Sequence, residues 1–168
     1  TVLARFLTDY SEEELRHCVE TAYSKERFGD FPAPLHLLKD NLDVLELWHG
    51  PTCAFKDMAL QILPLFLTKA VQKTGEQKKL VILVATSGDT GKAAMAGFAD
   101  VPETEVIVFY PQEGVSDIQK LQMVTQKGAN VHAVAVEGNF DDAQTGVKIL
   151  FGSRPLAEEL QAHGCAFS

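Results

Sequence analysis

The residue best suited to covalent chemistry is Lys56, in the segment Pro51-Thr52-Cys53-Ala54-Phe55-Lys56-Asp57. A turn precedes this lysine and a long apolar run follows it, so we expect Lys56 at the amino end of a helix. An apolar neighbour such as Phe55 and the positive end of a helix dipole both disfavour the ammonium form, which leaves more of the lysine as the free amine. A free amine is the nucleophile that imine formation needs. An ordinary solvated lysine paired with Asp57 is the alternative interpretation.

The second candidate is the segment Ala85-Thr86-Ser87-Gly88-Asp89-Thr90-Gly91, which joins an apolar strand to a helix rich in small residues. At such a junction, free backbone N–H groups and the helix dipole favour a bound carboxylate or phosphate. The residues predicted to bind an anion are Ser87, Gly88, Asp89, Thr90 and Gly91. Nucleotide motifs do not fit, because Gly88 to Gly91 is a GxxG followed by Lys92 and not a P-loop or a GxGxxG run. A plain strand-to-helix turn is the alternative here.

The histidines and cysteines indicate neither a metal site nor a thiol nucleophile. No two of the five histidines have metal-ligand spacing on one element, so we expect no bound metal. Cys53 lies three residues before Lys56, but no histidine is placed locally to activate it. The three cysteines are odd in number, far apart and without CxxC spacing, which predicts a reducing, cytoplasmic compartment rather than a disulfide framework.

Strand-like runs alternate with helical patterns in the second half of the chain, at residues 80–85, 105–110 and 131–136. The helix between the last two begins at a capping box of Ser116 with Gln119 and should end at Lys127-Gly128. This alternation predicts an α/β fold with a parallel sheet and right-handed crossovers. Ligands of such folds collect at the carboxyl ends of the strands, where residues 85–91 lie.

The first half of the chain predicts the elements around the candidate lysine. An S-x-x-E capping box predicts a helix over residues 12–23, and a short strand is expected at residues 44–48. From Asp57 to about residue 71 the side chains are apolar on nearly every face of a helix. This pattern predicts one buried helix with a kink at Pro64.

The composition indicates a single globular domain, because 168 residues with 46% hydrophobic and 23% charged residues match ordinary globular proteins. A net charge of −8 and the lack of a basic stripe argue against a nucleic-acid partner. No uncharged apolar stretch reaches the roughly 18 residues that a membrane helix needs, so no membrane segment is expected. No basic region typical of a signal peptide follows Thr1, and the missing Met indicates a true start upstream.

Taken together, the two candidate segments resemble the threonine synthase family. The resemblance rests on the spacing between the segments and on their sequences, Leu47-Trp48-His49-Gly50-Pro51-Thr52-Cys53-Ala54-Phe55-Lys56-Asp57 and residues 85–91. It continues through Val108-Phe109-Tyr110-Pro111 and residues 116–119 and 136–144, and is looser over residues 1–43. The resemblance implies a three-layer αβα fold with a parallel sheet. This is the fold type II arrangement of pyridoxal-phosphate enzymes, similar to the β subunit of tryptophan synthase.

The resemblance also implies an activity and a cofactor. Threonine synthases use pyridoxal 5′-phosphate to convert O-phosphohomoserine and water into threonine and phosphate, the last step of threonine biosynthesis. Lys56 would be the catalytic residue that holds the cofactor as an imine and moves protons at the carbons beside it. Ser87 and Asp89 would contact the cofactor. The residues that would bind the substrate are Ser87, Gly88, Asp89, Thr90 and Gly91.

Two other functions stay open. A threonine synthase-like phospholyase would share Lys56 and release a 2-oxo acid rather than threonine. A non-catalytic module would hold a small anion in the loop of residues 87–91 alone. A small-molecule substrate is compatible with a monomer and with a homo-oligomer.

The family pattern divides the chain into three regions. These are a mainly helical region (residues 1–43), a region with a strand, the lysine turn and the buried helix (44–79), and the parallel βα units of the small domain (80–168). The family's glycine-rich loop for the cofactor phosphate and its pyridine-nitrogen contact lie beyond Ser168, so the C-terminal large-domain portion is expected to be absent. Gly138-Asn139-Phe140 resembles that phosphate loop superficially, but we interpret it as a structural junction. Cys53 and Lys92 stand where the family more often has an apolar and a small residue.

Overall fold

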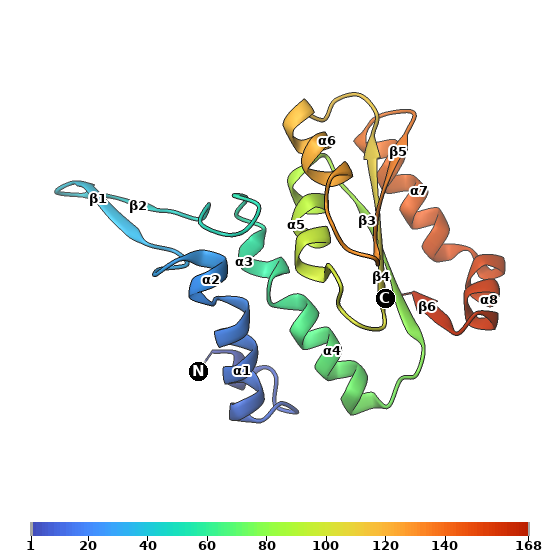
Figure 1. Ribbon diagram of the computed structural model, residues 1–168, viewed down its shortest axis with the longest axis horizontal. Coiled ribbons are helices and arrows are strands. Elements are labelled where there is room, and N and C mark those ends of the chain that lie inside the picture. Colours follow the sequence, from blue (N-terminus) through green and yellow to red (C-terminus); the bar gives the residue numbers. More distant parts are fainter. Residues whose placement is uncertain (1, 168) are drawn as a thin grey trace.

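The computed structural model describes residues 2–167, whose second half contains a four-stranded parallel sheet (Figure 1). The strands are β3 (Lys79–Ala85), β4 (Thr104–Pro111), β5 (Val131–Val136) and β6 (Cys165–Phe167), in the order β5-β4-β3-β6. Ala85 pairs with Phe109 and Pro111 pairs with Val136, so the carboxyl ends of three strands meet at one edge of the sheet. The three strands predicted from the sequence are confirmed, with small shifts at their ends.

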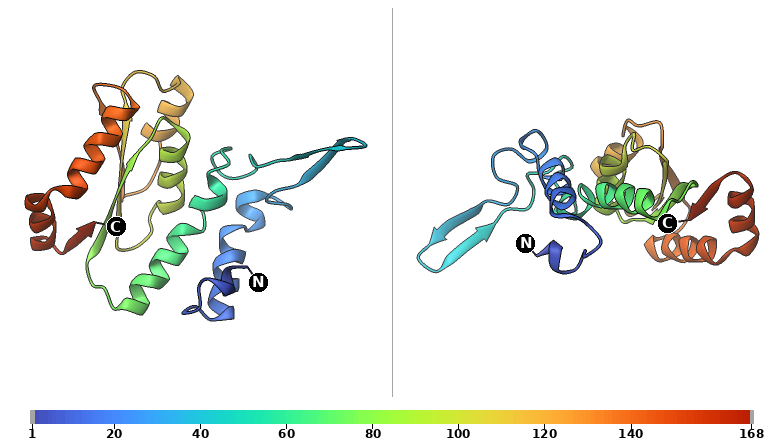
Figure 2. Two further views of the ribbon diagram at one scale, coloured as in Figure 1. Left: turned by 180° about the vertical axis from the view of Figure 1, so that it is seen from behind. Right: turned by 90° about the horizontal axis from the view of Figure 1, so that it is seen from below.

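Helices cover both faces of this sheet. α5 (Asp89–Phe98) and α6 (Asp117–Val124) lie against one face, and α7 (Phe140–Gly152) packs on the other, with α8 (Arg154–Ala162) beside β6 (Figures 1 and 2). Each of α5 and α6 follows a strand and returns the chain to the start of the neighbouring strand. The predicted three-layer αβα arrangement is therefore confirmed.

The main hydrophobic core lies between the sheet and the pair α5 and α6. Alternate residues of β4 point into it, because successive side chains of a strand face opposite sides. Ile107 and Phe109 point to the α7 side and are only half-buried, so that face is less completely covered. The buried side chains of the core are Met95, Phe98, Val106, Val108, Tyr110, Met123 and Val131.

The first half of the chain contains a group of helices, of which α3 and α4 pack against α5. α1 (Glu12–Ala22) begins at the predicted capping box. The other helical segments are η1 (Leu3–Arg5), a 3-10 helix, α2 (Lys25–Phe28), α3 (Asp57–Leu60) and α4 (Leu63–Thr74). Tyr10 Oη donates to the carbonyl of Phe66 at 2.8 Å, and Tyr23 Oη donates to the carbonyl of Met58 at 2.6 Å. These two bonds join the ends of α1 to α4 and α3.

Two glycines let α5 approach its neighbours closely. A Cβ atom at Gly91 would lie 2.5 Å from Thr86 Cγ2 and 2.6 Å from Val108 Cγ1. A Cβ atom at Gly97 would lie 2.1 Å from the carbonyl oxygen of Leu60, at the end of α3. Real Cβ atoms do not come this near to other atoms, so only glycine permits the observed distance of α5 from β3 and α3.

Residues 35–45 form an antiparallel hairpin that the sequence pattern did not indicate. β1 (Leu35–Lys39) pairs with β2 (Leu42–Leu45), and the two strands project away from the helices (Figure 1). The strand expected at residues 44–48 was therefore wrong in its bounds, and the hairpin crosses the expected boundary between residues 43 and 44. The hairpin leucines lack the alternation of a half-buried strand, and all five are exposed, namely Leu35, Leu37, Leu38, Leu42 and Leu45.

The apolar run after Asp57 forms two helices rather than the single one predicted. α3 ends at Leu60 and α4 begins at Leu63. Pro64 lies in the first turn of α4, where a missing amide removes no hydrogen bond, so this proline starts a helix and does not kink one. The predicted complete burial is also wrong, because Leu63 is 45% exposed. Within residues 2–167, α4 packs against α1, α3 and α5, and its residues from Leu65 to Val71 are half-buried.

α6 ends earlier than the predicted stop at Lys127-Gly128. Its last helical residue is Val124, and Thr125 Oγ1 donates to the carbonyl of Leu121 at 2.6 Å. The threonine thus satisfies a helix-end carbonyl, and Gly128 lies instead in the loop that leads to β5.

Replacing Gly97 with alanine should push α3 away from α5, because the new methyl group would overlap the carbonyl of Leu60. Overpacking of this kind costs about 1–3 kcal/mol, which exceeds the gain of up to about 1 kcal/mol that alanine brings to a helix. Urea denaturation should therefore show a lower midpoint. Gly146→Ala in α7 is the matched control, since no atom lies within 4 Å of its added Cβ. Equal midpoints for the two variants would contradict this packing.

Candidate functional site

The turn that carries Lys56 is built around the buried carboxylate of Asp57. Asp57 Oδ2 accepts a hydrogen bond from the Thr52 amide, and Asp57 Oδ1 accepts one from Thr52 Oγ1, both at 2.8 Å. A Cβ atom at Gly50 would lie 2.5 Å from Asp57 Cβ, so residues 50–57, which we call the Lys56 turn, close tightly over the carboxylate. Within residues 2–167, Asp57 forms no ion pair with Lys56, so the alternative of a lysine paired with Asp57 is wrong.

Lys56 lies at the start of α3, as predicted. Its carbonyl accepts hydrogen bonds from the amides of Ala59 at 3.1 Å and Leu60 at 2.9 Å. Its Nζ lies 3.7 Å from the centroid of the Phe55 ring, which is a cation–π arrangement. The surroundings of Lys56 are less apolar than expected, because Phe55 is 57% exposed. The effect of the helix dipole is also smaller than expected, because α3 is a single turn. Lys56 is therefore half-buried, with its amine beside one aromatic ring.

A buried hydroxyl group organises the loop of residues 87–91. Thr86 is 1% exposed, and its Oγ1 accepts hydrogen bonds from the amides of Gly88 and Gly91, both at 2.9 Å. The Thr86 amide donates to the carbonyl of Phe109 at 3.0 Å, which fixes the start of the loop to β4. Two of the amides predicted to bind an anion are thus already used within the protein.

Three amides of this loop remain open. Those of Ser87, Asp89 and Thr90 have no hydrogen-bond acceptor within residues 2–167. Asp89 and Thr90 begin the ten-residue helix α5, so its dipole adds to the attraction for an anion. Gly88 has a φ of 146°, a conformation that glycine adopts at little cost. Of the five residues predicted to bind an anion, three therefore offer a free amide donor, and the two glycines shape the loop.

α3 and α5 bring the two candidate segments side by side (Figure 1). Lys92 of α5 is half-buried, within reach of the charge of Asp57. Burial lowers the pKa of Lys92, and the negative charge of Asp57 counteracts part of that effect. Lys92 Nζ also donates to Gln126 Oε1 in the loop after α6. Lys92, the departure from the family pattern, thus lies between the Lys56 turn and the segment after α6.

Gln119 contacts the 87–91 loop in a way that the sequence analysis missed. Its Nε2 donates to Asp89 Oδ1 at 2.7 Å. A Cβ atom at Gly88 would lie 2.5 Å from Gln119 Cδ, so the Gln119 side chain covers that glycine. The capping box with Ser116 revealed the start of α6, but it carried no signal for the second bond, which joins residues 30 positions apart.

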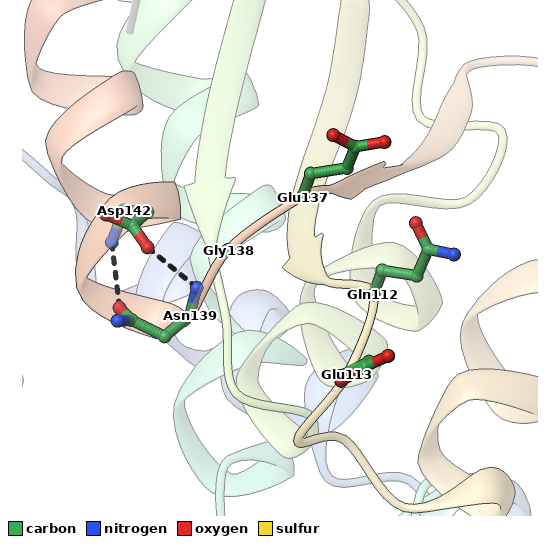
Figure 3. Close-up of a pocket in the computed structure, with 6 residues that line it drawn as sticks. All are labelled: Gln112, Glu113, Glu137, Gly138, Asn139 and Asp142. Carbon is green, nitrogen blue, oxygen red and sulfur yellow. Dashed lines mark hydrogen bonds between the residues drawn. The ribbon is translucent and has the colours of Figure 1, made fainter.

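The hollow at the carboxyl ends of β4 and β5 does not suit an anion (Figure 3). It encloses about 540 Å³ and is lined by Gln112, Glu113, Glu137, Gly138, Asn139 and Asp142. Asn139 Oδ1 accepts from the amides of Asp141 at 2.8 Å and Asp142 at 3.2 Å, and Asp142 Oδ2 accepts from the Asn139 amide at 2.8 Å. These amides are used to cap α7, and three carboxylates face the hollow. Gly138-Asn139-Phe140 is therefore a structural junction, as predicted.

The rest of the described chain adds no metal site. Among residues 2–167, no group of three or more His, Cys, Asp and Glu side chains is arranged to hold a metal ion. Over the same residues, no helix combines the length and the apolar character needed to cross a membrane.

Comparison with known proteins assigns the chain to a class. A family model described as "Pyridoxal-phosphate dependent enzyme" matches residues 32–162, and the chain belongs to that family. Within it, the chain is similar to threonine synthases. The threonine synthase of Pseudomonas aeruginosa is 47% identical over 134 residues, which cover 77% of this chain and 28% of the relative. The human protein "Threonine synthase-like 1" is 39% identical over 148 residues, 85% of this chain and 20% of the relative.

Solved structures agree with the sequence comparison. The structure of yeast threonine synthase has a TM-score of 0.81 at 34% identity and covers 96% of this chain and 33% of that one. A threonine synthase from Brucella melitensis with bound PLP has a TM-score of 0.80 at 36% identity, covering 93% of this chain and 32% of that one. The chain spans about a third or less of the length of each of these relatives.

The residues present fit the cofactor of the family. A cofactor of this class is held by a lysine amine, and Lys56 offers a half-buried amine beside the Phe55 ring. The open amides at the start of α5 can donate to an anionic group of a bound molecule. Both groups of donors are held in place by buried side chains, Asp57 for the first and Thr86 for the second.

Replacing Thr86 with valine should loosen the 87–91 loop, because valine has nearly the same side-chain volume as threonine but lacks the hydroxyl group. The variant lacks Oγ1, so the amides of Gly88 and Gly91 lose their acceptor, at a cost of about 1–3 kcal/mol in the free energy of unfolding. Hydrogen exchange of these two amides should also accelerate, as measured by NMR. Thr86→Ser keeps the hydroxyl and is the control that should retain slow exchange. If Thr86→Val protects the amides as well as Thr86→Ser, the hydroxyl does not organise the loop.

Proposed function

We propose that this chain carries the cofactor lysine and the substrate-carboxylate loop of a threonine synthase. The complete enzyme would convert O-phosphohomoserine and water into threonine and phosphate, acting as a carbon-oxygen lyase. The observation that carries the proposal is that threonine synthases match this chain much better than another enzyme of the same fold does. Threonine synthases match with TM-scores of 0.80–0.81 at 34–36% identity, whereas a cystathionine beta-synthase from Helicobacter pylori matches with 0.53 at 18% identity.

In this proposal Lys56 is the catalytic residue. Its Nζ binds the cofactor, and the same nitrogen accepts and returns protons at the substrate carbons. When bound, pyridoxal phosphate would withdraw electrons from the substrate carbons, which makes the loss of a proton and of the γ-phosphate possible. The two bonds from Thr52 to Asp57 keep the Lys56 turn rigid, so Nζ starts from a fixed backbone.

The 87–91 loop would bind the substrate carboxylate. The amides of Ser87, Asp89 and Thr90 are the donors, and the dipole of α5 adds to their attraction for an anion. Gly88 and Gly91 belong to the site through the shape that they give the loop. We also propose that the side chains of Ser87 and Asp89 contact the cofactor.

A threonine synthase-like phospholyase is the second candidate. It is favoured by the human and rat proteins named "Threonine synthase-like 1" and "Threonine synthase-like 2", which are 39% and 40% identical to this chain. These identities are close to the 43% of the fission yeast threonine synthase. Product analysis with O-phosphohomoserine separates the two enzymes, because one releases threonine and the other a 2-oxo acid.

The setting of the protein is part of the proposal. We propose a cytoplasmic enzyme, in keeping with the free Cys18, Cys53 and Cys165, and a small-molecule substrate with no nucleic-acid partner. We assign residues 80–168 to the small domain of such an enzyme. A monomer and a homo-oligomer are both compatible with these features.

Borohydride reduction tests the role of Lys56. The complete polypeptide loaded with pyridoxal phosphate should show the visible absorbance of a lysine-bound cofactor, and reduction should fix the cofactor on the peptide that contains Lys56. Lys56→Ala should lose both the absorbance and the label. Lys92→Ala is the matched control, because Lys92 is the half-buried lysine of the neighbouring helix. Wild-type labelling of Lys56→Ala would refute the assignment, and no bound cofactor at all would favour the anion-binding module.

A further inference from the structure

We propose that Gln119 is a positioning residue that keeps the open amides of the 87–91 loop available by holding the Asp89 carboxylate away from them. The inference rests on the proposed function, because it takes these amides as the site of the substrate carboxylate. It concerns a side chain of α6, outside the Lys56 turn and the 87–91 loop.

The carboxamide of Gln119 is fixed at both ends. Its Nε2 donates to Asp89 Oδ1 at 2.7 Å, and its Oε1 accepts from Ser116 Oγ at 3.0 Å and from the Ser116 amide at 3.3 Å. An ionised carboxylate only accepts hydrogen bonds and a backbone amide only donates, so the carboxamide has a single orientation that satisfies both partners. Gln119 thus forms a bridge from the cap of α6 to the first residue of α5, passing over Gly88.

Asp89 needs such a partner because of its position. A carboxylate in the first turn of a helix is attracted by the same free amides and the same dipole that would attract a substrate carboxylate. Without Gln119, the Asp89 side chain would compete with the substrate for the amides of Ser87 and Thr90. Bonded to Nε2, the Asp89 carboxylate has a donor outside the loop. The amides of Ser87, Asp89 and Thr90 then have no acceptor within residues 2–167 and can serve a ligand.

Gln119→Glu separates this role from helix capping. A glutamate at this position keeps the capping box with Ser116, but it sets a second carboxylate against Asp89. In the holoenzyme, Gln119→Glu should raise the KM for O-phosphohomoserine about tenfold, as expected for the loss of a charge-assisted hydrogen bond, with a much smaller change in kcat. Ser116→Ala is the matched control. It removes the hydroxyl cap that Gln119→Glu keeps, and it leaves the Ser116 amide bond to Gln119 and the bond between Gln119 and Asp89 in place, so KM should stay nearly unchanged.

The variant Asp89→Asn tests whether the negative charge of Asp89 causes the rise in KM. With Asp89→Asn, the added Gln119→Glu should no longer raise KM, because an asparagine carries no charge and can donate to the new glutamate. Activity is not the only readout. In the unloaded protein, NMR titration with inorganic phosphate should shift the amide signals of Ser87, Asp89 and Thr90, and Gln119→Glu should weaken that binding by a similar factor.

Three results would overturn the inference. These are an unchanged KM and phosphate affinity in Gln119→Glu, an equal rise in KM for Ser116→Ala, or the same effect of Gln119→Glu in both backgrounds. Borohydride labelling keeps this test separate from the proposed function. Label on Lys56 together with an inert Gln119→Glu refutes only the positioning role, whereas the absence of label on Lys56 refutes the proposed function whatever Gln119 does.

Discussion

The contact between α3 and α5 is the constraint on which the arrangement of the candidate site depends. α3 carries Lys56 at its start, and α5 begins with the open amides of the 87–91 loop. The distance between the two helices is set by Gly97, where even a methyl group would meet the carbonyl of Leu60. The hydrophobic core behind α5 holds that helix against the sheet, so the position of Lys56 is fixed relative to the carboxyl ends of the strands.

Buried polar side chains hold the two candidate segments in shape. Asp57 closes the Lys56 turn, and Thr86 closes the 87–91 loop, each through two hydrogen bonds. A buried polar group without partners is unfavourable, so these side chains restrict each backbone to a conformation that satisfies them. The groups left open, Lys56 Nζ and three amides, are those that a ligand can reach. Gln119 similarly gives the Asp89 carboxylate a hydrogen-bond partner outside the loop.

The pattern of hydrophobic residues predicted burial better in the second half of the chain, which contains the parallel sheet, than in the first half. The core residues of β4 and α5 are buried, but most apolar residues of α4 are only half-buried and the leucines of the β1–β2 hairpin are exposed. An apolar pattern indicates that a surface tends to be covered, and it does not specify which element covers it. Within residues 2–167, no element packs over these leucines, and the chain spans about a third of the length of the threonine synthases that it resembles.

The sequence by itself determined the local features. Capping boxes marked the starts of α1 and α6, apolar runs marked the three main strands, and the two motifs marked Lys56 and the 87–91 loop. These signals are readable because each depends on residues a few positions apart. The tertiary structure alone decided which amides are open, because the acceptor for Gly88 and Gly91 is a buried hydroxyl whose orientation follows from the packing of α5 on β3. It also placed Gln119 beside Asp89, since a contact between residues 30 positions apart exists only once α5 and α6 lie together on the same face of the sheet.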